Sequence, residues 1–128
     1  MTKTPPLAIA LSALVASYAI GAALALTGDV GELGDVLGNG TKLSAPLFLI
    51  AVEVLAGLAI LTRRAPLAGA VVLAAASGLS LAAAAFDGDV AHQGLTAGQV
   101  AWQGVEVACA AAVFALAVTR IRRRPAAA

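Results

Sequence analysis

The sequence predicts an all-α integral membrane protein, a four-helix up-down bundle with both termini in the cytoplasm. Of its 128 residues, 61% are hydrophobic and 12% are charged, whereas a soluble domain has roughly 45–50% apolar and about 25% charged residues. Four apolar stretches are each about 20 residues long, the length that crosses a bilayer as a helix. These predicted spans are residues 7–26, 43–62, 66–86 and 97–119, in one transmembrane domain that covers residues 1–128.

The first predicted span, residues 7–26, follows Pro5 and Pro6, which suit the start of a helix and not its interior. A cleaved signal peptide is the alternative reading of this segment. Its apolar region is longer than the usual ~7–15 residues, and the end at 23–27 is a poor cleavage site. We therefore expect a retained helix. The outer loop that follows, residues 27–42, contains five glycines, which disfavour a regular helix.

The second and third predicted spans, residues 43–62 and 66–86, are separated by only a few residues and should form a tight antiparallel hairpin. Pro46 suits the first turn of the second span. The third span is rich in alanine and also contains glycine and serine. Small residues let helix backbones approach closely in lipid, so we expect this span to be the most enclosed of the four.

The fourth predicted span, residues 97–119, follows a second outer loop at residues 87–96. Thr96 is placed to cap its first turn, because threonine side chains accept hydrogen bonds from helix N-termini. The single cysteine, Cys109, lies within this span and has no partner for an internal disulfide. We read it as a small packing residue.

Positive charge is distributed unevenly between the two predicted sides of the membrane. The positive-inside rule then places both termini in the cytoplasm of a multi-pass cell-membrane protein, in a bacterium the inner membrane. The basic C-terminal tail suggests contact with anionic membrane lipid and not with nucleic acid. One side has Lys3, Arg63, Arg64, Arg120, Arg122, Arg123 and Arg124, and the other has Lys42 with Asp29, Glu32, Asp35, Asp87 and Asp89.

Two of the predicted spans each contain one glutamate, Glu53 and Glu106. A carboxylate inside a membrane costs on the order of a few kcal/mol, so it should face the protein interior and have a use. At about 1.5 Å per residue, Glu53 lies roughly 15 Å and Glu106 roughly 13–14 Å below the outer ends of their spans. The two glutamates are therefore the candidate catalytic residues.

Other polar residues are predicted at a similar depth. Tyr18 and Ser77 lie about 12–13 Å and Ser80 about 9 Å from the outer ends of their spans. On the fourth span, Gln99 and Gln103 lie on the same helical face as Glu106. The candidate ligand-binding residues are Tyr18, Ser77, Ser80, His92 at the rim, Gln99, Trp102 beside the Glu106 face, and Gln103.

This layer predicts a polar pocket with apolar walls that opens outward or sideways into lipid. Two carboxyls at one depth do not both ionise easily in a low dielectric, and a protonated and an ionised carboxyl together can act as general acid and base. The alternative is that each glutamate only hydrogen-bonds to a neighbouring helix. The sequence has no nucleotide loop, haem ligand pair or zinc signature, so we predict no cofactor and no metal. Asp87, Asp89 and His92 are too short a cluster to predict a metal site.

The segment Leu47–Ser77 resembles the middle of DoxX-like small membrane proteins. Those proteins are four-span chains of similar length, with a glutamate and then a glycine in the second span and a short threonine–arginine turn after it. The corresponding residues here are Glu53, Gly57, Thr62 and Arg63. The resemblance covers about a quarter of the chain and implies a four-helix bundle. It also implies an association with membrane redox complexes and quinones.

The leading hypothesis for function is a protein that binds a lipophilic small molecule, of quinone, isoprenoid or polyketide type, between Glu53 and Glu106. If it is an enzyme, it is a cofactorless isomerase, cyclase or epoxide-opening enzyme, since such reactions need only an acid, a base and apolar walls. One alternative is a proton-coupled small transporter that acts as a homodimer or larger oligomer. Another is a noncatalytic subunit of a larger membrane redox complex.

Overall fold

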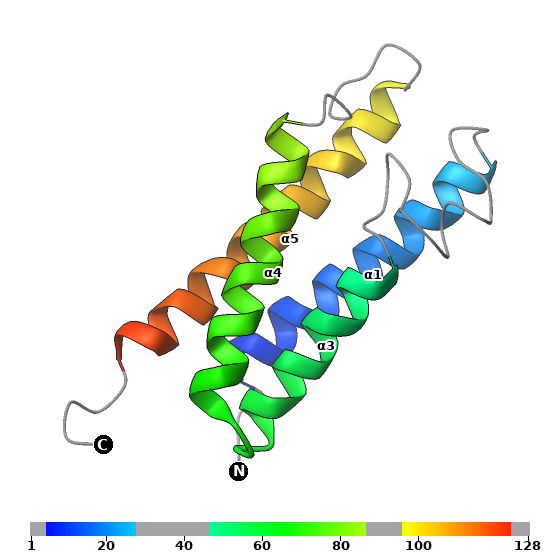
Figure 1. Cartoon of the computed structure of the whole chain (residues 1–128). Coiled ribbons are helices and arrows are strands. Elements are labelled where there is room, and N and C mark those ends of the chain that lie inside the picture. The colour runs from blue at the N-terminus through cyan, green and yellow to red at the C-terminus, as the bar shows by residue number, and fades with distance from the viewer. Residues whose placement is uncertain (1–4, 28–46, 87–95, 124–128) are drawn as a thin grey trace.

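The computed structural model describes residues 5–27, 47–86 and 96–123, and these residues form four helices (Figure 1). The all-helical prediction is confirmed for them. Helix α1 (Pro6–Thr27) and helix α4 (Pro66–Phe86) begin and end within one residue of the predicted spans. Helix α3 (Leu47–Leu61) ends one residue before the predicted end, and residues 43–46 lie outside the described residues. Helix α5 (Ala97–Arg122) continues three residues further than predicted.

Three of the helices are long and apolar enough to cross a membrane, which confirms the membrane character that the sequence predicts. The qualifying segments are Pro6–Thr27, Pro66–Ala84 and Ala97–Arg122. Helix α3 is apolar but has 15 residues, which span about 22 Å. That length is shorter than the roughly 30 Å hydrocarbon core of a bilayer.

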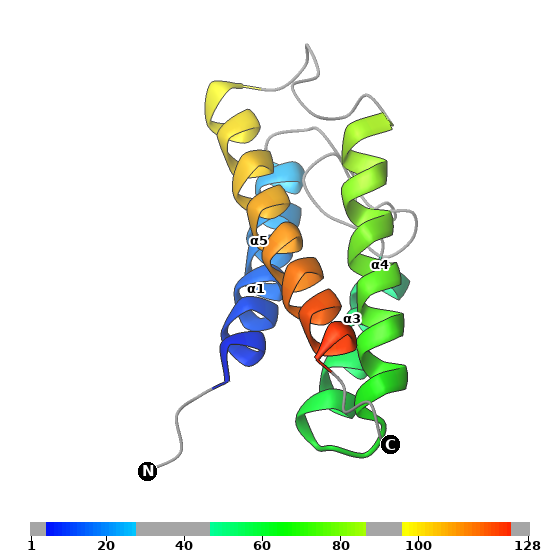
Figure 2. The same cartoon turned by 90° about the vertical axis from the view of Figure 1, so that its left-hand side faces the viewer.

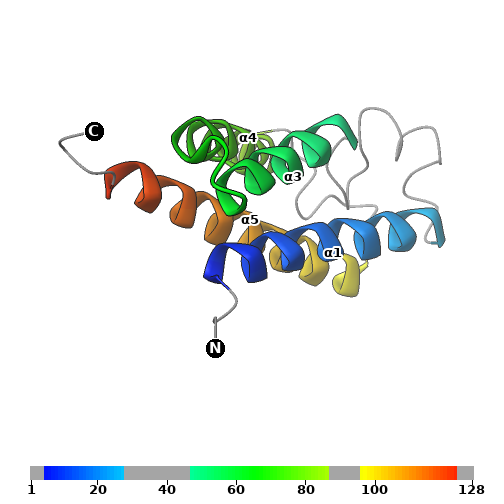
Figure 3. The same cartoon turned by 90° about the horizontal axis from the view of Figure 1, so that it is seen from below.

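The four helices alternate in direction along the chain, so that the start of α1 and the end of α5 lie at the same end of the bundle (Figure 1). Seen from below, α3 and α4 form one layer, and α1 and α5 form the other (Figure 3). Helix α4 packs extensively against both α3 and α5, and α1 packs mainly against α5 (Figure 2). The contact between α1 and α3 is much smaller.

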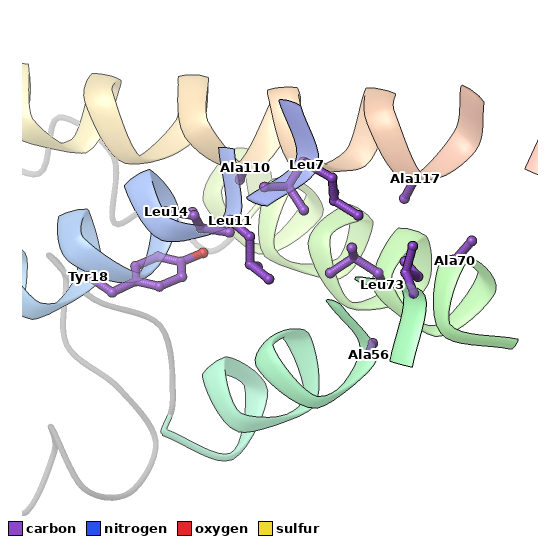
Figure 4. Close-up of a cluster of buried hydrophobic side chains, with 11 residues drawn as sticks. Leu7, Leu11, Leu14, Tyr18, Ala56, Ala70, Leu73, Ala110 and Ala117 are labelled. Carbon is purple, nitrogen blue, oxygen red and sulfur yellow. The ribbon is translucent and has the colours of Figure 1, made fainter. Parts of the chain in front are cut away.

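The buried core is narrow and consists mostly of leucine and alanine (Figure 4). Leu14, Leu73 and Val113 are completely buried within it. Large apolar side chains of the same kinds also cover the outside of the bundle, as Leu55 and Leu79 do, with 66% and 59% of their surface exposed. In water such a surface would be unfavourable, whereas lipid tails are as apolar as leucine.

Glycines allow two pairs of helices to approach closely. A Cβ atom on Gly69 of α4 would lie 2.7 Å from the backbone oxygen of Ala56 and 2.9 Å from Cγ1 of Ile60, both on α3. A Cβ atom on Gly57 of α3 would overlap Cδ2 of Leu11 on α1. Gly69 thus allows α3 and α4 to pack closely, but the apolar segment of α4 is less buried than that of α1, so the third span is not the most enclosed.

The turn between α3 and α4 reverses the chain within four residues, from Thr62 to Ala65, as predicted for a tight hairpin. Arg63 has a positive φ of 59°, a left-handed conformation that non-glycine residues adopt uncommonly. Its N–H donates to the carbonyl of Ile60 at 3.1 Å, and the N–H of Ala65 donates to the carbonyl of Ala59 at 3.2 Å. These bonds satisfy carbonyls at the end of α3 that have no partner within the helix.

Helix α5 begins with a capping box, which confirms the predicted cap. The Gln99 N–H donates to Oγ1 of Thr96 at 3.2 Å, and the Thr96 N–H donates to Oε1 of Gln99 at 2.8 Å. Each bond satisfies a backbone donor that the first turn would otherwise leave unpaired. The cap fixes the residue at which α5 begins, and with it the position of Glu106 along the helix.

Candidate functional site

Both glutamates of the predicted spans are buried in the bundle. Glu53 of α3 has 0% and Glu106 of α5 has 8% of its surface exposed. Glu53 lies on the helix face that also buries Leu49 and Ile60, and Glu106 lies on the face that buries Val113. Because these residues are spaced four or seven positions apart, about one or two helical turns, one face of each helix carries its glutamate and its core residues together.

Glu53 is joined to α4 and α1 through hydroxyl groups. The Ser80 hydroxyl of α4 donates to Oε1 of Glu53 at 3.1 Å and also lies 3.2 Å from the carbonyl of Ala76 on its own helix. The hydroxyl of Tyr18, a buried residue of α1, interacts with Ser80. Three helices therefore meet at the Ser80 hydroxyl.

Glu106 is joined to α1 through Trp102. The indole Nε1 of Trp102 donates to the backbone carbonyl of Ser17 at 3.0 Å, and the same side chain interacts with the Glu106 carboxyl one helical turn further along α5. The indole ring is half-buried. Trp102 thus holds the Glu106 side of α5 against α1.

The Tyr18 hydroxyl links the two halves of this arrangement, because it interacts with both Glu53 and Glu106. In Figure 4, Tyr18 lies at one end of the apolar core, beyond Leu11 and Leu14 along α1. We call the assembly the buried acidic cluster, and all four helices contribute to it. Its members are Tyr18, Glu53, Ser80, Trp102 and Glu106.

Each carboxyl in the buried acidic cluster has one oxygen without a hydrogen bond. Among the residues that the structure describes, no donor reaches Oε2 of Glu53 or Oε1 of Glu106. Buried polar atoms are paired in the great majority of cases, and an exception calls for an explanation. A catalytic role or a ligand is one such explanation, and both unpaired atoms belong to the cluster.

Three other predicted site residues have different surroundings. Ser77 is completely buried, and its hydroxyl donates to the Leu73 carbonyl of its own helix at 2.6 Å. Gln99 belongs to the capping box at the start of α5. Gln103 is buried on α5 and has an interaction partner of its own. His92, predicted at the rim, lies outside the described residues.

Ser17 is a contact residue that the sequence did not indicate. Its carbonyl accepts the Trp102 indole N–H, and its buried hydroxyl donates to the Leu14 carbonyl at 2.7 Å. The donor, Trp102, lies 85 residues further along the chain, on α5. No residue type marks a backbone acceptor in a sequence, so this contact required the structure.

No group of three or more histidine, cysteine, aspartate or glutamate side chains within residues 5–27, 47–86 and 96–123 is arranged to hold a metal ion. The chemistry available in the buried acidic cluster is therefore that of two carboxyls, a phenol, a hydroxyl and an indole N–H. Such groups can transfer protons, orient a polar group and bind a positive charge.

The fold and the cluster together define a class: a helical membrane protein with acidic side chains buried between its helices. Comparison with known proteins adds no nearer relationship, since no protein-family model, no curated protein and no solved structure matches the chain. The function is therefore inferred from the geometry of the buried acidic cluster.

Removing the Ser80 hydroxyl should destabilise the bundle, because Ser80→Ala would deprive Glu53 of its hydrogen-bond donor. We expect a loss of about 1–3 kcal/mol in the free energy of unfolding, the range for a buried group left unpaired. Ser77→Ala, three residues away, is the control, because it removes a hydrogen bond from the Ser77 hydroxyl to the backbone of the same helix. Unfolding of purified protein in detergent, followed by circular dichroism, measures both. Equal losses would contradict a special role for Ser80.

Proposed function

We propose that this protein binds a lipophilic small molecule at the buried acidic cluster and converts it by acid–base catalysis. The observation that carries the proposal is the pair of buried carboxyls from α3 and α5, each with an oxygen that has no donor among the described residues. A carboxyl retained only to join helices would be expected to use both oxygens. The unpaired oxygens are the groups that a ligand would contact.

The proposed chemistry needs one carboxyl protonated and the other ionised. Glu53 and Glu106 would be the acid and the base, and Tyr18 between them would orient the polar group of the ligand. Proton transfer by positioned side chains contributes typically 10²–10⁴-fold to a rate. An isomerase, a cyclase or an epoxide-opening enzyme for an isoprenoid, polyketide or quinone-like molecule would need nothing else. The resemblance to DoxX-like proteins, which remains a prediction, also favours a lipophilic ligand.

Ligand retention tests this proposal directly. Native mass spectrometry of gently extracted protein should show a co-purifying small molecule, and Glu53→Gln and Glu106→Gln should each lower its occupancy. We expect at least about tenfold weaker binding, because a hydrogen bond to a charged group contributes about 1.5–3 kcal/mol and 1.4 kcal/mol corresponds to tenfold. Glu32→Gln is the matched control, since it makes the same chemical change in the predicted outer loop.

The circular dichroism spectrum shows whether each glutamine variant remains helical. If Glu53→Gln and Glu106→Gln both remain folded and both keep the full occupancy of the co-purifying molecule, the proposal is contradicted. Wild-type protein that is consistently empty after extraction in several mild detergents and directly from membranes would also contradict it.

We further propose that both chain termini and the turn between α3 and α4 lie on the cytoplasmic side. The support is the positive charge: Arg63 and Arg64 are exposed at that turn, and Arg120, Arg122 and Arg123 lie at the same end of the bundle. Positive residues near the ends of spans are retained in the cytoplasm.

Cysteine labelling tests this orientation in a Cys109→Ala background. We expect Asp89→Cys to react with a membrane-impermeant maleimide in intact bacteria, and Arg123→Cys to react only in inside-out vesicles. The opposite pattern would show that the chain is inserted the other way round.

A further inference from the structure

Two oxygen atoms of the buried acidic cluster have no hydrogen-bond donor among the described residues. The Ser80 hydroxyl already donates to Glu53, and the Trp102 indole N–H already donates to the Ser17 carbonyl. The nearby Ser77 and Ser17 hydroxyls donate to carbonyls of their own helices. The two atoms left unpaired are Oε2 of Glu53 and Oε1 of Glu106, and in an ionised carboxylate such an oxygen can only accept a hydrogen bond. A ligand that satisfies them has to bring donors of its own.

The cluster also lacks a positive partner among the described residues. The titratable side chains that interact with Tyr18 within residues 5–27, 47–86 and 96–123 are the two carboxyls and Cys109, none of which is cationic. All the described arginines are exposed, at the α3–α4 turn and at the end of α5. None of the arginines that the structure describes therefore compensates an ionised carboxylate in the interior, although buried charges are normally paired.

We infer that the ligand is a lipophilic organic cation, a protonated amine on an apolar body. This inference rests on the proposed lipophilic site and narrows its ligand to one that carries an amine, whose positive charge would favour the ionised form of the carboxyls beside it. A primary ammonium group has three N–H donors and no acceptor, the complement of two unpaired carboxyl oxygens. It also supplies the missing positive charge, and hydrogen bonds between ammonium and carboxylate are roughly twice as strong as neutral ones.

Two further features suit such a ligand. The cluster includes two aromatic side chains, Tyr18 and Trp102, and aromatic rings attract ammonium groups to their faces. The surrounding core consists of leucine, alanine and valine, which would accommodate an apolar body. A carboxylic acid of the same shape would instead bring a negative charge against Glu53 and Glu106 and should be rejected.

The experiment compares three molecules that share one apolar cage: 1-adamantylamine, 1-adamantanol and 1-adamantanecarboxylate. Trp102 is the only tryptophan in the chain and belongs to the cluster, so its fluorescence reports occupancy. Titrations at pH 7 use the full chain in nanodiscs of zwitterionic lipid, which do not attract the amine electrostatically. We expect saturable binding of the amine, at least about tenfold weaker binding of the alcohol, and none of the carboxylate.

Variants separate binding at the cluster from partitioning into lipid. Glu53→Gln and Glu106→Gln should each weaken amine binding by about tenfold or more, whereas Glu32→Gln should leave it unchanged. Glu53→Asp keeps a carboxylate and should keep the preference for the amine over the alcohol, and it serves if a glutamine variant does not fold.

Two results would overturn the cation inference. One is binding of the alcohol as tightly as the amine in a glutamate-dependent manner, which would leave the proposed lipophilic site intact but assign it a neutral ligand. The other is an amine response that is absent, or that is unchanged in the glutamine variants. Neither depends on the co-purifying molecule sought by mass spectrometry, so failure of the inference and failure of the proposed function are distinguishable.

Discussion

Gly69→Ala is expected to destabilise the bundle by about 1–3 kcal/mol, the usual cost of inserting an extra group into a packed core. The added methyl group would lie 2.7 Å from the backbone oxygen of Ala56, which cannot move without shifting α3. Glu53 lies one turn from Ala56 on that helix, so the displacement should also disturb the buried acidic cluster. Chemical unfolding in detergent, followed by circular dichroism, measures the change in stability.

Gly104→Ala provides a control of opposite sign. Gly104 is exposed on α5, and a Cβ atom there would have no heavy atom within 4 Å. Alanine favours a helix over glycine by about 1 kcal/mol, so this variant should be equally stable or more stable than the wild type. If Gly69→Ala behaved in the same way, α3 and α4 would not pack as closely as the structure shows.

Leu73→Ala should have an even larger effect on stability, about 2–5 kcal/mol. Leu73 is completely buried in the apolar core, where α4 contacts both of its neighbours (Figure 4). Truncation removes packing contacts and leaves a cavity that the surrounding helices can only partly fill. The same unfolding measurement applies, and a binding assay with the co-purifying molecule would show whether the cluster is affected.

Leu79→Ala makes the identical change on the same helix at a lipid-facing position, where 59% of the side chain is exposed. Lipid chains can occupy the space that the missing methyl groups leave, so the loss of stability should be below about 0.5 kcal/mol, as for surface substitutions. A comparable loss at both positions would mean that Leu79 is covered by protein, for example by a second copy of the chain.

The level of the polar residues along each helix could be predicted from the sequence because the rise of an α-helix is fixed. Counting residues placed Tyr18, Glu53, Ser80 and Glu106 at similar depths, and the structure brings these four side chains into one cluster. The capping role of Thr96 could be predicted for a similar reason, since it depends only on local sequence.

The rotation of each helix about its axis could not be predicted in the same way. In a soluble protein, polar residues mark the outward face, whereas here Leu73 is buried and Leu79 is exposed with no difference in residue type. Ser77 and Ser80 differ by less than one turn, yet only Ser80 reaches Glu53. That distinction depends on a rotation of α4 that packing determines. The contact of Trp102 with the Ser17 carbonyl depends on the tilt of α5 against α1.

Arg63, in the turn between α3 and α4, has a positive φ. Glycine would adopt this conformation freely, whereas a residue with a side chain is destabilised there by roughly 1–2 kcal/mol. The sequence nevertheless has two arginines, Arg63 and Arg64, in the turn between α3 and α4. Carrying two guanidinium groups through the hydrocarbon layer would cost at least about 5 kcal/mol on the translocon scale. In the orientation proposed above, this cost would keep the turn between α3 and α4 on the cytoplasmic side.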